Sequence, residues 1–155
     1  MISLVAAMAN NNVIGNKGVI PWKIKSEQQR FRNLTQGKTI IIGRISYEEI
    51  SNPLPDRKII VISGTKKFNG CITVSSLAEA LDIAKNEAEI FIAGGGQVYR
   101  DTIELADMLY LTKIDLTVDG DVFFPKFDES QYVKIYEEQV DNDIPYTFYT
   151  YKRII

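Results

Sequence analysis

Short apolar runs separated by turn-forming residues are the strongest pattern along the chain. Residues 2–9 form the first run, and the turn-prone Asn10-Asn11-Asn12 follows it directly. Continuous apolar runs of this length are typical of strands that are buried on both faces of a sheet. The same pattern predicts strands over residues 39–42, 58–63, 71–74, 89–93 and 108–114.

Helices are predicted between several of these strands. The Ser-x-x-Gln run at residues 26–29 and the Ser-x-x-Glu run at residues 76–79 have the spacing of capping boxes, so a helix should begin at each. We expect the first helix to extend to about Thr35 and to stop at Gly37. Shorter helices are expected over residues 44–50 and 97–104.

The other segments have loop or hairpin patterns. Residues 10–23 are rich in Asn, Gly and Lys, which is loop chemistry, and the two prolines in residues 52–55 favour an extended turn. The tail over residues 131–151 alternates and is rich in Tyr, Val and Ile, with the turn-prone residues 141–143 at its middle. This tail is predicted to be an antiparallel hairpin.

Strands that alternate with helices indicate an α/β fold. We expect a central mixed, mostly parallel eight-stranded sheet with helices on both faces and the antiparallel hairpin at its C-terminal end. No repeat, linker or low-complexity stretch divides the chain, so residues 1–155 are expected to form a single domain.

Composition narrows the chemistry. The 155 residues include 18 Lys and Arg, 20 Asp and Glu, and no His. The near-neutral balance argues against nucleic acid as the main partner, because nucleic-acid-binding proteins usually carry a basic excess. Without His there is no Ser-His-Asp triad, no Cys-His dyad and no imidazole acid or base. Acid–base work therefore falls to a carboxylate, a Lys, a Tyr or the single thiol.

The single thiol also bears on the compartment. Cys71 is the only cysteine, so the chain makes no internal disulfide and no thiolate metal cage, and we expect no metal. Residues 1–15 have no positive n-region, and their apolar stretch is too short to span a membrane. We expect a cytoplasmic protein without a membrane partner, and a monomer, since nothing in the sequence points to an obligate interface.

Glycines at three strand ends mark candidate ligand-binding turns: Gly43-Arg44, Ser63-Gly64 and Gly94-Gly95-Gly96. Ligands of open α/β sheets bind beyond the carboxyl ends of the strands, and glycine lets a phosphate approach the backbone. The usual G-x-G-x-x-G fingerprint is absent, because Tyr99 stands where its last glycine would be. Each turn is equally compatible with a tight connection that binds nothing.

Cations follow two of these strand ends. Arg44, Lys66 and Lys67 are candidates for contact with a phosphate on the ribose of a cofactor. For Lys66 and Lys67 taken alone, solvated surface charge explains the pattern better.

Glu27 is the sharpest candidate for acid–base chemistry. It lies in the first turn of the predicted helix, between Trp22 and Phe31, and Phe31 is on the same helix face. A carboxyl group in an aromatic pocket loses solvation, which raises its pKa and suits it to bind an amidine-like nitrogen pair or to supply protons near neutral pH. The alternative is that Glu27 only stabilises the helix dipole, and spacing alone favours that alternative.

A set of short motifs, in order along essentially the whole chain, resembles the dihydrofolate reductase family. These motifs are Val13-Ile14-Gly15, Ile20-Pro21-Trp22, Phe31, Thr35, Gly43-Arg44, Leu54-Pro55-x-Arg57, Gly94-Gly95-Gly96-x-Val98-Tyr99, Leu111-Thr112, Gly120-Asp121 and Phe124-Pro125. The resemblance implies reduction of 7,8-dihydrofolate to tetrahydrofolate with NADPH as hydride donor. It also implies that Glu27 promotes protonation of the pterin.

The resemblance further implies the residues that surround the substrate and the reacting atoms. Thr112 would orient Glu27, and Arg57 would pair with the glutamate tail of folate, a task that suits the bidentate geometry of arginine. The catalytic set it implies is Glu27, Trp22, Tyr99 and Thr112, and the substrate-binding set is Val5, Ala6, Glu27, Gln28, Phe31, Ile50, Arg57, Ala93 and Thr112.

The resemblance implies a cofactor site built from the glycine turns and the lid. Arg44 would meet the 2′-phosphate, a cis peptide would join Gly94 to Gly95, and Asp121 would steady the lid. The cofactor-binding set it implies is Ala7, Ile14, Ile20, Gly43, Arg44, Ile45, Ser46, Ser63, Gly64, Gly94, Gly95, Gly96, Gln97, Val98 and Tyr99.

The chain departs from common members of that family at several places. Glu27-Gln28 and the small Ala93 before the glycines resemble the mobile, trimethoprim-insensitive members. Ile45, Gly64 and Gln97 stand where relatives often place phosphate-contacting groups, which weakens the expected NADPH preference unless Lys66 or Lys67 compensates.

Two other functions fit parts of the pattern: a reductase of the same fold that acts on a pyrimidine or another pteridine, and a non-catalytic nucleotide- or folate-binding module. Glu27 with Arg57 argues against the first, because one suits a pterin and the other a glutamyl tail. The lid-like loop with Thr112 argues against the second.

Overall fold

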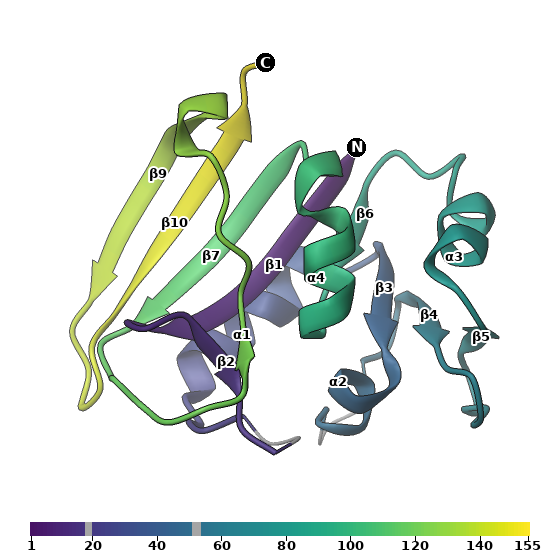
Figure 1. Cartoon of the computed structure of the whole chain (residues 1–155), viewed down its shortest axis with the longest axis horizontal. Helices are drawn as coiled ribbons and strands as arrows, with labels where there is room; N and C mark the ends of the chain where they lie inside the picture. The colour runs from purple at the N-terminus through teal and green to yellow at the C-terminus, as the bar shows by residue number, and fades with distance from the viewer. Residues whose placement is uncertain (18–19, 51–53) are drawn as a thin grey trace.

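One eight-stranded sheet forms the centre of the molecule in the computed structural model, which describes residues 1–17, 20–50 and 54–155 (Figure 1). The strand order across the sheet is β5-β4-β3-β6-β1-β7-β10-β9. The strands are β1 (Ile2–Ala9), β3 (Thr39–Gly43), β4 (Lys58–Ile62), β5 (Ile72–Val74), β6 (Ile90–Ile92), β7 (Met108–Ile114), β9 (Tyr132–Val140) and β10 (Tyr146–Arg153). Every strand that the apolar runs predicted is present within a residue or two.

Parallel pairing extends from β5 to β7, and antiparallel pairing takes over at the hairpin. Leu4 of β1 pairs with Ile92 of β6 on one side and with Leu109 of β7 on the other. All three side chains are fully buried, which explains why these strands are continuously apolar. β10 pairs antiparallel with β7 and with β9, so the predicted mixed sheet with a C-terminal hairpin is confirmed.

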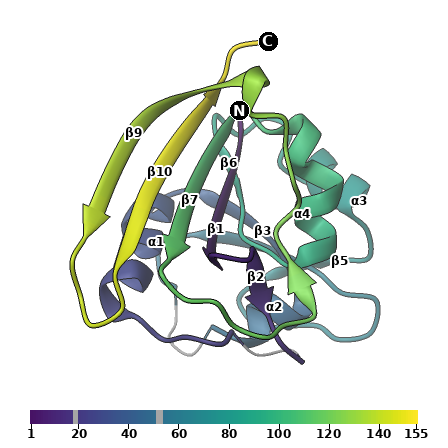
Figure 2. The ribbon, with the colours of Figure 1, turned by 60° about the vertical axis from the view of Figure 1, so that its left-hand side comes forward.

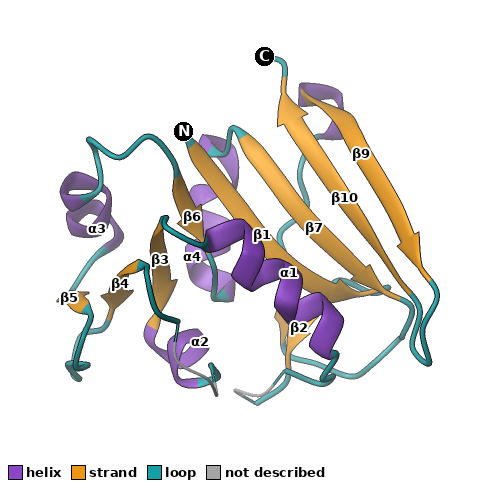
Figure 3. Ribbon diagram, turned by 180° about the vertical axis from the view of Figure 1, so that it is seen from behind, coloured by secondary structure: helices purple, strands orange, loops and turns teal. Residues whose placement is uncertain are grey.

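Helices cover both faces of the sheet. α1 (Lys25–Thr35) lies on one face, where Phe31 and Leu34 pack on the side chains of β3, β4 and β6, and Figure 3 shows it in front of the strands. α3 (Leu77–Ile83) and α4 (Gly96–Thr102) lie on the opposite face, seen in front of the sheet in Figure 1. The other helical segments are α2 (Arg44–Glu48) and the 3-10 turns η1 (Ile103–Leu105) and η2 (Glu129–Gln131).

Only one of the two predicted capping boxes caps its helix. Ser76 accepts a hydrogen bond from the backbone N–H of Glu79 at 3.1 Å, as expected at the start of α3. The predicted start of the first helix is confirmed within a residue, since α1 begins at Lys25, but the predicted cap is wrong: α1 has no side-chain cap, and the Ser26 hydroxyl hydrogen bonds to the hydroxyl of Tyr146. The end of α1 at Thr35 agrees with the prediction, and Gly37 beyond it has a φ of +73°.

The segment predicted as a simple loop contains a short strand. β2 (Val13–Gly15) pairs antiparallel with β8 (Val122–Phe123), and Figure 2 shows the two side by side. Gly120 permits this close approach, because a Cβ there would meet Val13 Cγ1 at 2.2 Å. Strands this short leave no periodic pattern. The first half of the predicted turn at residues 52–55 lies outside the described residues, which omit 51–53.

Two further departures concern helix ends. α2 ends at Glu48 rather than at residue 50, although the N–H groups of Glu49 and Ile50 still donate to carbonyls one turn back. α4 ends at Thr102, and the chain continues into η1 as a 3-10 turn. Among the described helices, none is both long and apolar enough to cross a membrane.

Candidate functional site

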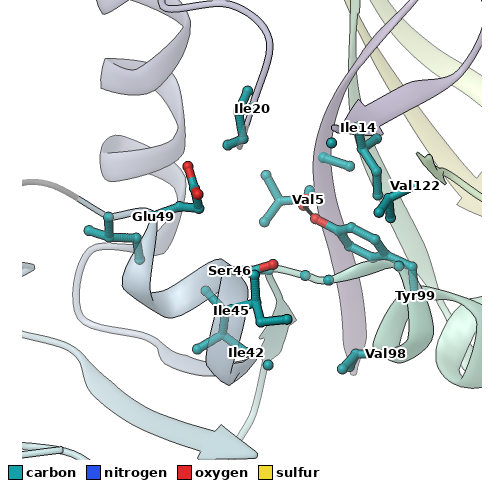
Figure 4. Close-up of a pocket in the computed structure, with 18 of the residues that line it drawn as sticks. Val5, Ile14, Ile20, Ile42, Ile45, Ser46, Glu49, Val98, Tyr99 and Val122 are labelled. Carbon is teal, nitrogen blue, oxygen red and sulfur yellow. Dashed lines mark hydrogen bonds between the residues drawn. The ribbon is translucent and has the colours of Figure 1, made fainter. Parts of the chain in front are cut away.

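A cavity of 640 Å³ opens at the carboxyl ends of the parallel strands, between α1, α2 and α4. Its volume lies within the range of small-molecule and cofactor sites. In Figure 4 the ring of Tyr99 reaches from α4 towards Val5, and Ile45 and Ser46 come from α2. The lining residues are Val5, Ala6, Ala7, Ile14, Gly15, Ile20, Trp22, Glu27, Gln28, Phe31, Arg32, Ile42, Gly43, Arg44, Ile45, Ser46, Glu49, Ile50, Leu54, Ile62, Ser63, Gly64, Ala93, Gly94, Gly95, Gly96, Gln97, Val98, Tyr99, Arg100, Asp121 and Val122.

Glu27 is one of three acidic side chains that line this cavity, together with Glu49 and Asp121. It projects from the first turn of α1, and Trp22 and Phe31 line the cavity beside it. Burial raises the pKa of Glu27 from an ordinary 4.5 to about 7. A hydrogen bond from the side chain of Thr112 and the positive charge of Arg30 oppose this rise. The carboxyl group therefore exchanges its proton near neutral pH.

Thr112 hydrogen bonds to Glu27 from β7. It lies on β7, opposite Ala7 of β1, and is 4% exposed. Thr112 does not line the cavity itself, so its hydroxyl acts on whatever enters the cavity only through Glu27. This placement agrees with the orienting role that the family resemblance implies.

Tyr99 is buried in the cavity wall, and its hydroxyl proton is already used in a hydrogen bond. Its hydroxyl donates to the backbone carbonyl of Val5 at 2.7 Å, and its ring packs against Phe124 at 5.1 Å between centroids. Burial, together with the negative charge of Glu27, raises the pKa of Tyr99 far above its usual range. Tyr99 is therefore a poor proton donor and a good structural link between α4 and β1.

Two glycine turns meet at the edge of the cavity. The backbone N–H of Gly43 donates to the carbonyl of Gly94 at 2.8 Å, and the Gly94–Gly95 peptide is cis, as expected. Ser46 packs against this peptide so closely that a Cβ at Gly95 would lie 2.8 Å from its Oγ. Side chains are thereby excluded from the junction, which leaves backbone polar groups at the surface of the cavity.

Two cations meet at one carboxylate beside the glycine turns. Arg44 Nη1 lies 2.7 Å from Glu48 Oε1, and Lys66 Nζ lies 3.5 Å from Glu48 Oε2. The hydrogen bond from Arg44 is the main reason why the pKa of Glu48 is lowered. Arg44 lines the cavity, whereas Lys66 and Lys67 do not.

The loop between β1 and α1 is tied to the segment before β8. The Asp121 carboxylate accepts the backbone N–H of Lys17 at 3.1 and 3.2 Å, and the backbone N–H of Asp121 donates to the carbonyl of Gly15 at 3.1 Å. Ile14 and Ile20 of this loop line the cavity together with Asp121. These bonds hold one side of the loop over the cavity mouth.

Almost all of the predicted site residues line this one cavity, and the two that do not are Thr112 and Arg57. The guanidinium group of Arg57 is held by three hydrogen bonds. It donates from Nε to Thr35 Oγ1 at 2.9 Å, from Nη1 to the carbonyl of Pro55 at 2.5 Å and from Nη2 to the carbonyl of Arg32. Since guanidinium has five donors, two N–H groups, one on each terminal nitrogen, make no hydrogen bond to the residues that the structure describes.

Sequence reasoning missed several lining residues: Arg32, Ile42, Glu49, Leu54, Ile62, Arg100 and Val122. Arg32 lies four residues after Gln28 on α1, so the same helix face would have indicated it. Ile42 and Ile62 lie at the carboxyl ends of two parallel strands, as the next-to-last residue of β3 and the last of β4, where ligands of such sheets bind. Among the described residues, no group of three or more Cys, Asp and Glu side chains has the arrangement of a metal site.

Comparisons with known proteins agree on one family. The sequence profile of dihydrofolate reductase matches residues 1–153. The chain is 42% identical over 145 residues to the dihydrofolate reductase of Bacillus subtilis, covering 92% of this chain and 86% of that protein. It is 37% identical over 155 residues to dihydrofolate reductase type A13 of Escherichia coli, covering 98% and 94%. A solved dihydrofolate reductase from Enterococcus faecalis, complexed with NADP(H) and RAB-propyl, superimposes with a TM-score of 0.91 at 31% identity, covering 100% and 97%.

Proposed function

Since the chain belongs to the dihydrofolate reductase family, an oxidoreductase family that reduces 7,8-dihydrofolate to tetrahydrofolate with NADPH, we propose which of its side chains carry out the reaction. The observation that carries the proposal is Glu27: it is an acidic group in an apolar cavity, with a pKa of about 7. No other described side chain at the cavity combines a proton that exchanges near neutral pH with such burial.

Glu27 binds the pterin and promotes its protonation. In its ionised form the carboxylate accepts hydrogen bonds from an amino group and an adjacent ring N–H, and in its protonated form it is a proton source, through a water, for the ring nitrogen beside the reduced carbon. Thr112 orients the carboxylate by hydrogen bonding. Trp22 and Phe31 exclude water, which favours both roles. Tyr99 is the weaker candidate for the acid because its proton is held by Val5.

The rest of the substrate site is apolar with one cationic end. Val5, Ala6, Ile50 and Ala93 surround the ring system, and Gln28 and Phe31 face it from α1. Arg57 pairs with the carboxylate of the glutamate tail. The three bonds that Arg57 makes to Thr35, Pro55 and Arg32 support this role, because they fix the guanidinium while leaving an N–H on each terminal nitrogen for a bidentate contact.

The remaining part of the cavity fits NADPH. The cofactor supplies hydride when it is bound. Ala7, Ile14 and Ile20 enclose the nicotinamide, and the glycines of both turns allow the pyrophosphate to approach backbone N–H groups. Ser46, Ser63, Gly64, Gln97 and Val98 line the path to Arg44. Arg44 binds the 2′-phosphate, and Lys66 adds a second positive charge there because both cations contact Glu48.

A comparison of wild type with Glu27→Gln tests the proposal. The amide cannot supply a proton, so turnover of dihydrofolate, followed as NADPH oxidation, should fall about 100-fold or more at pH 7. The loss should shrink as the pH falls, because solvent protonates the substrate instead. Full activity of Glu27→Gln at neutral pH would contradict the assignment. Turnover of another pteridine in preference to dihydrofolate in a competition assay would contradict the substrate.

The proposal includes insensitivity to trimethoprim, which is supported by Glu27, Gln28 and Ala93. All three line the cavity, and the small Ala93 and polar Gln28 remove apolar contacts that a diaminopyrimidine inhibitor uses. An inhibition curve beside the Bacillus subtilis enzyme tests this. Equal inhibition at low drug concentration would contradict it.

The proposal includes a cytoplasmic monomer. The single Cys71, which is free, suits a reducing compartment. Size-exclusion chromatography with light scattering should give the mass of one chain, 17.6 kDa. A mass of two chains at micromolar concentration would contradict the monomer.

A further inference from the structure

Arg30 lies between α1 and the C-terminal hairpin, outside the groups to which the reaction has been assigned so far. The centre of its guanidinium group is 3.8 Å from the ring centroid of Phe148 on β10 and 5.4 Å from that of Tyr136 on β9. It also hydrogen bonds to the Tyr136 hydroxyl, whose proton is donated to Glu138 at 2.7 Å. A cation over two ring faces is attracted to both, so the hairpin holds Arg30 in place.

Arg30 follows Glu27 by three residues on α1, which makes the two side chains neighbours on one helix face. An arginine at this spacing is within reach of an ion pair with the carboxylate. Within the part of the chain that the structure describes, no ion pair joins Arg30 to Glu27. The aromatic rings draw the guanidinium towards the hairpin, and the carboxylate of Glu27 is left with its hydrogen bond from Thr112.

We propose that Arg30 is a positioning residue, whose guanidinium group, held on the rings of Phe148 and Tyr136, supplies a fixed positive charge beside Glu27 while leaving the carboxylate open to the cavity. A direct ion pair would occupy the oxygens that receive the pterin. A neutral residue would leave only the Thr112 hydrogen bond to oppose the effect of burial, and the carboxyl group would stay protonated to a higher pH. The clamped arginine avoids both outcomes.

The other groups that face Glu27 do not replace this charge. Thr112 on β7 is neutral, and Tyr99 on α4 also stays neutral because burial raises its pKa. Burial raises the pKa of Tyr110, also on β7, and the nearby guanidinium of Arg30 opposes that rise only in part, so Tyr110 is neutral as well. Arg30 is the charged group that lowers the pKa of Glu27, which otherwise rises on burial. The role rests on the proposed function only in so far as Glu27 is the acid.

The test measures the carboxyl group directly and without substrate. Protein labelled with ¹³C at the glutamate side-chain carboxyl is titrated by NMR, and Glu27→Gln identifies the resonance. In Arg30→Met the pKa of Glu27 should rise by about half a unit or more, since a nearby opposite charge shifts a carboxyl pKa downward. In Arg30→Lys the pKa of Glu27 should rise less, because lysine keeps the positive charge. Lys25→Met, which removes a charge from the same helix at an exposed position, is the matched control.

Arg30→Gln is a second neutral variant that can still hydrogen bond to Tyr136, and it should give the same rise if Arg30→Met does not fold. A rise in either neutral variant that is no larger than in Lys25→Met overturns the proposal. The proposal is also overturned if the pKa of Glu27 rises as much in Arg30→Lys as in the neutral variants, because the effect would then be structural rather than electrostatic.

The pH profile of NADPH oxidation separates the two proposals. In the neutral variants, the pH above which turnover declines should move upward with the pKa of Glu27. A shifted NMR titration with an unchanged profile would leave the role of Arg30 intact and contradict Glu27 as the acid.

Discussion

The side chain of Thr112 hydrogen bonds to the carboxylate of Glu27 and is itself buried in β7, behind the wall of the cavity. The two residues come from the central sheet and from the helix that covers it, so the bond ties Glu27 on α1 to β7. The hydrogen bond favours the ionised form of Glu27, whereas burial favours the protonated form. The balance of the two leaves the carboxyl group able to exchange its proton near pH 7.

Thr112→Val removes this bond with little change in volume. The pKa of Glu27 should rise further, and the carboxyl group should lose its fixed orientation. We expect a loss of about tenfold in kcat/KM for dihydrofolate, the equivalent of one hydrogen bond of about 1.4 kcal/mol. Steady-state kinetics across pH measures it. Thr112→Ser keeps a hydroxyl and should recover most of the activity, and equal losses in both variants would contradict the role of the hydrogen bond.

The raised pKa of Glu27 also predicts how stability changes with pH. The folded protein binds this proton up to about pH 7, whereas the unfolded chain releases it near 4.5, so ionisation of Glu27 destabilises the folded state as the pH rises between these values. Glu27→Gln does not incur this cost. It should exceed wild type in stability by up to about 3 kcal/mol above pH 7, and the gain should decrease towards pH 5.

Urea unfolding of wild type and Glu27→Gln from pH 5 to 8 measures this difference. A difference that stays constant over the range would show that Glu27 ionises at its ordinary pKa. The result does not depend on activity, so it tests the burial of the carboxyl group separately from its role in catalysis.

The cations around Glu48 predict a selectivity pattern. Arg44→Met should weaken binding of NADPH by roughly 10- to 100-fold and leave NADH almost unaffected, because charge-assisted bonds to the 2′-phosphate are lost. Lys66→Met should show a smaller loss of the same kind, since Lys66 contacts Glu48 from farther out. Lys67→Met is the control, and an equal loss for NADH in the Lys66 variant would contradict a phosphate contact.

The hydrophobic pattern predicted the sheet well, because the central parallel strands β1, β3 and β6 are buried on both faces and are therefore apolar along their length. The failures are contacts between distant segments. Ser26 and Ser76 have the same local motif, but only Ser76 caps its helix, since Tyr146 binds the Ser26 hydroxyl. The pairing of β2 with β8 likewise depends on Gly120, which lies far along the chain from β2.

The same distinction applies to the candidate site. Glu27 and the glycine turns stand out through local motifs, and the family resemblance led to most of the other cavity residues. The aromatic clamp on Arg30 was not predictable, because Phe148 and Tyr136 belong to the terminal hairpin and only the packing of α1 brings them together.

Asp121 carries a prediction about the loop over the cavity. Its carboxylate accepts the N–H of Lys17 through both oxygens, so Asp121→Ala frees that N–H while the β2–β8 pairing remains. The loop should then close less often over the bound ligands, and the hydride step should slow by roughly tenfold with little change in overall stability. Stopped-flow measurement of NADPH consumption, together with hydrogen exchange at residues 13–17, detects both effects. Asp119→Ala, at an exposed position nearby, is the control, and equal slowing in the two variants would mean that general charge rather than the Lys17 bond is responsible.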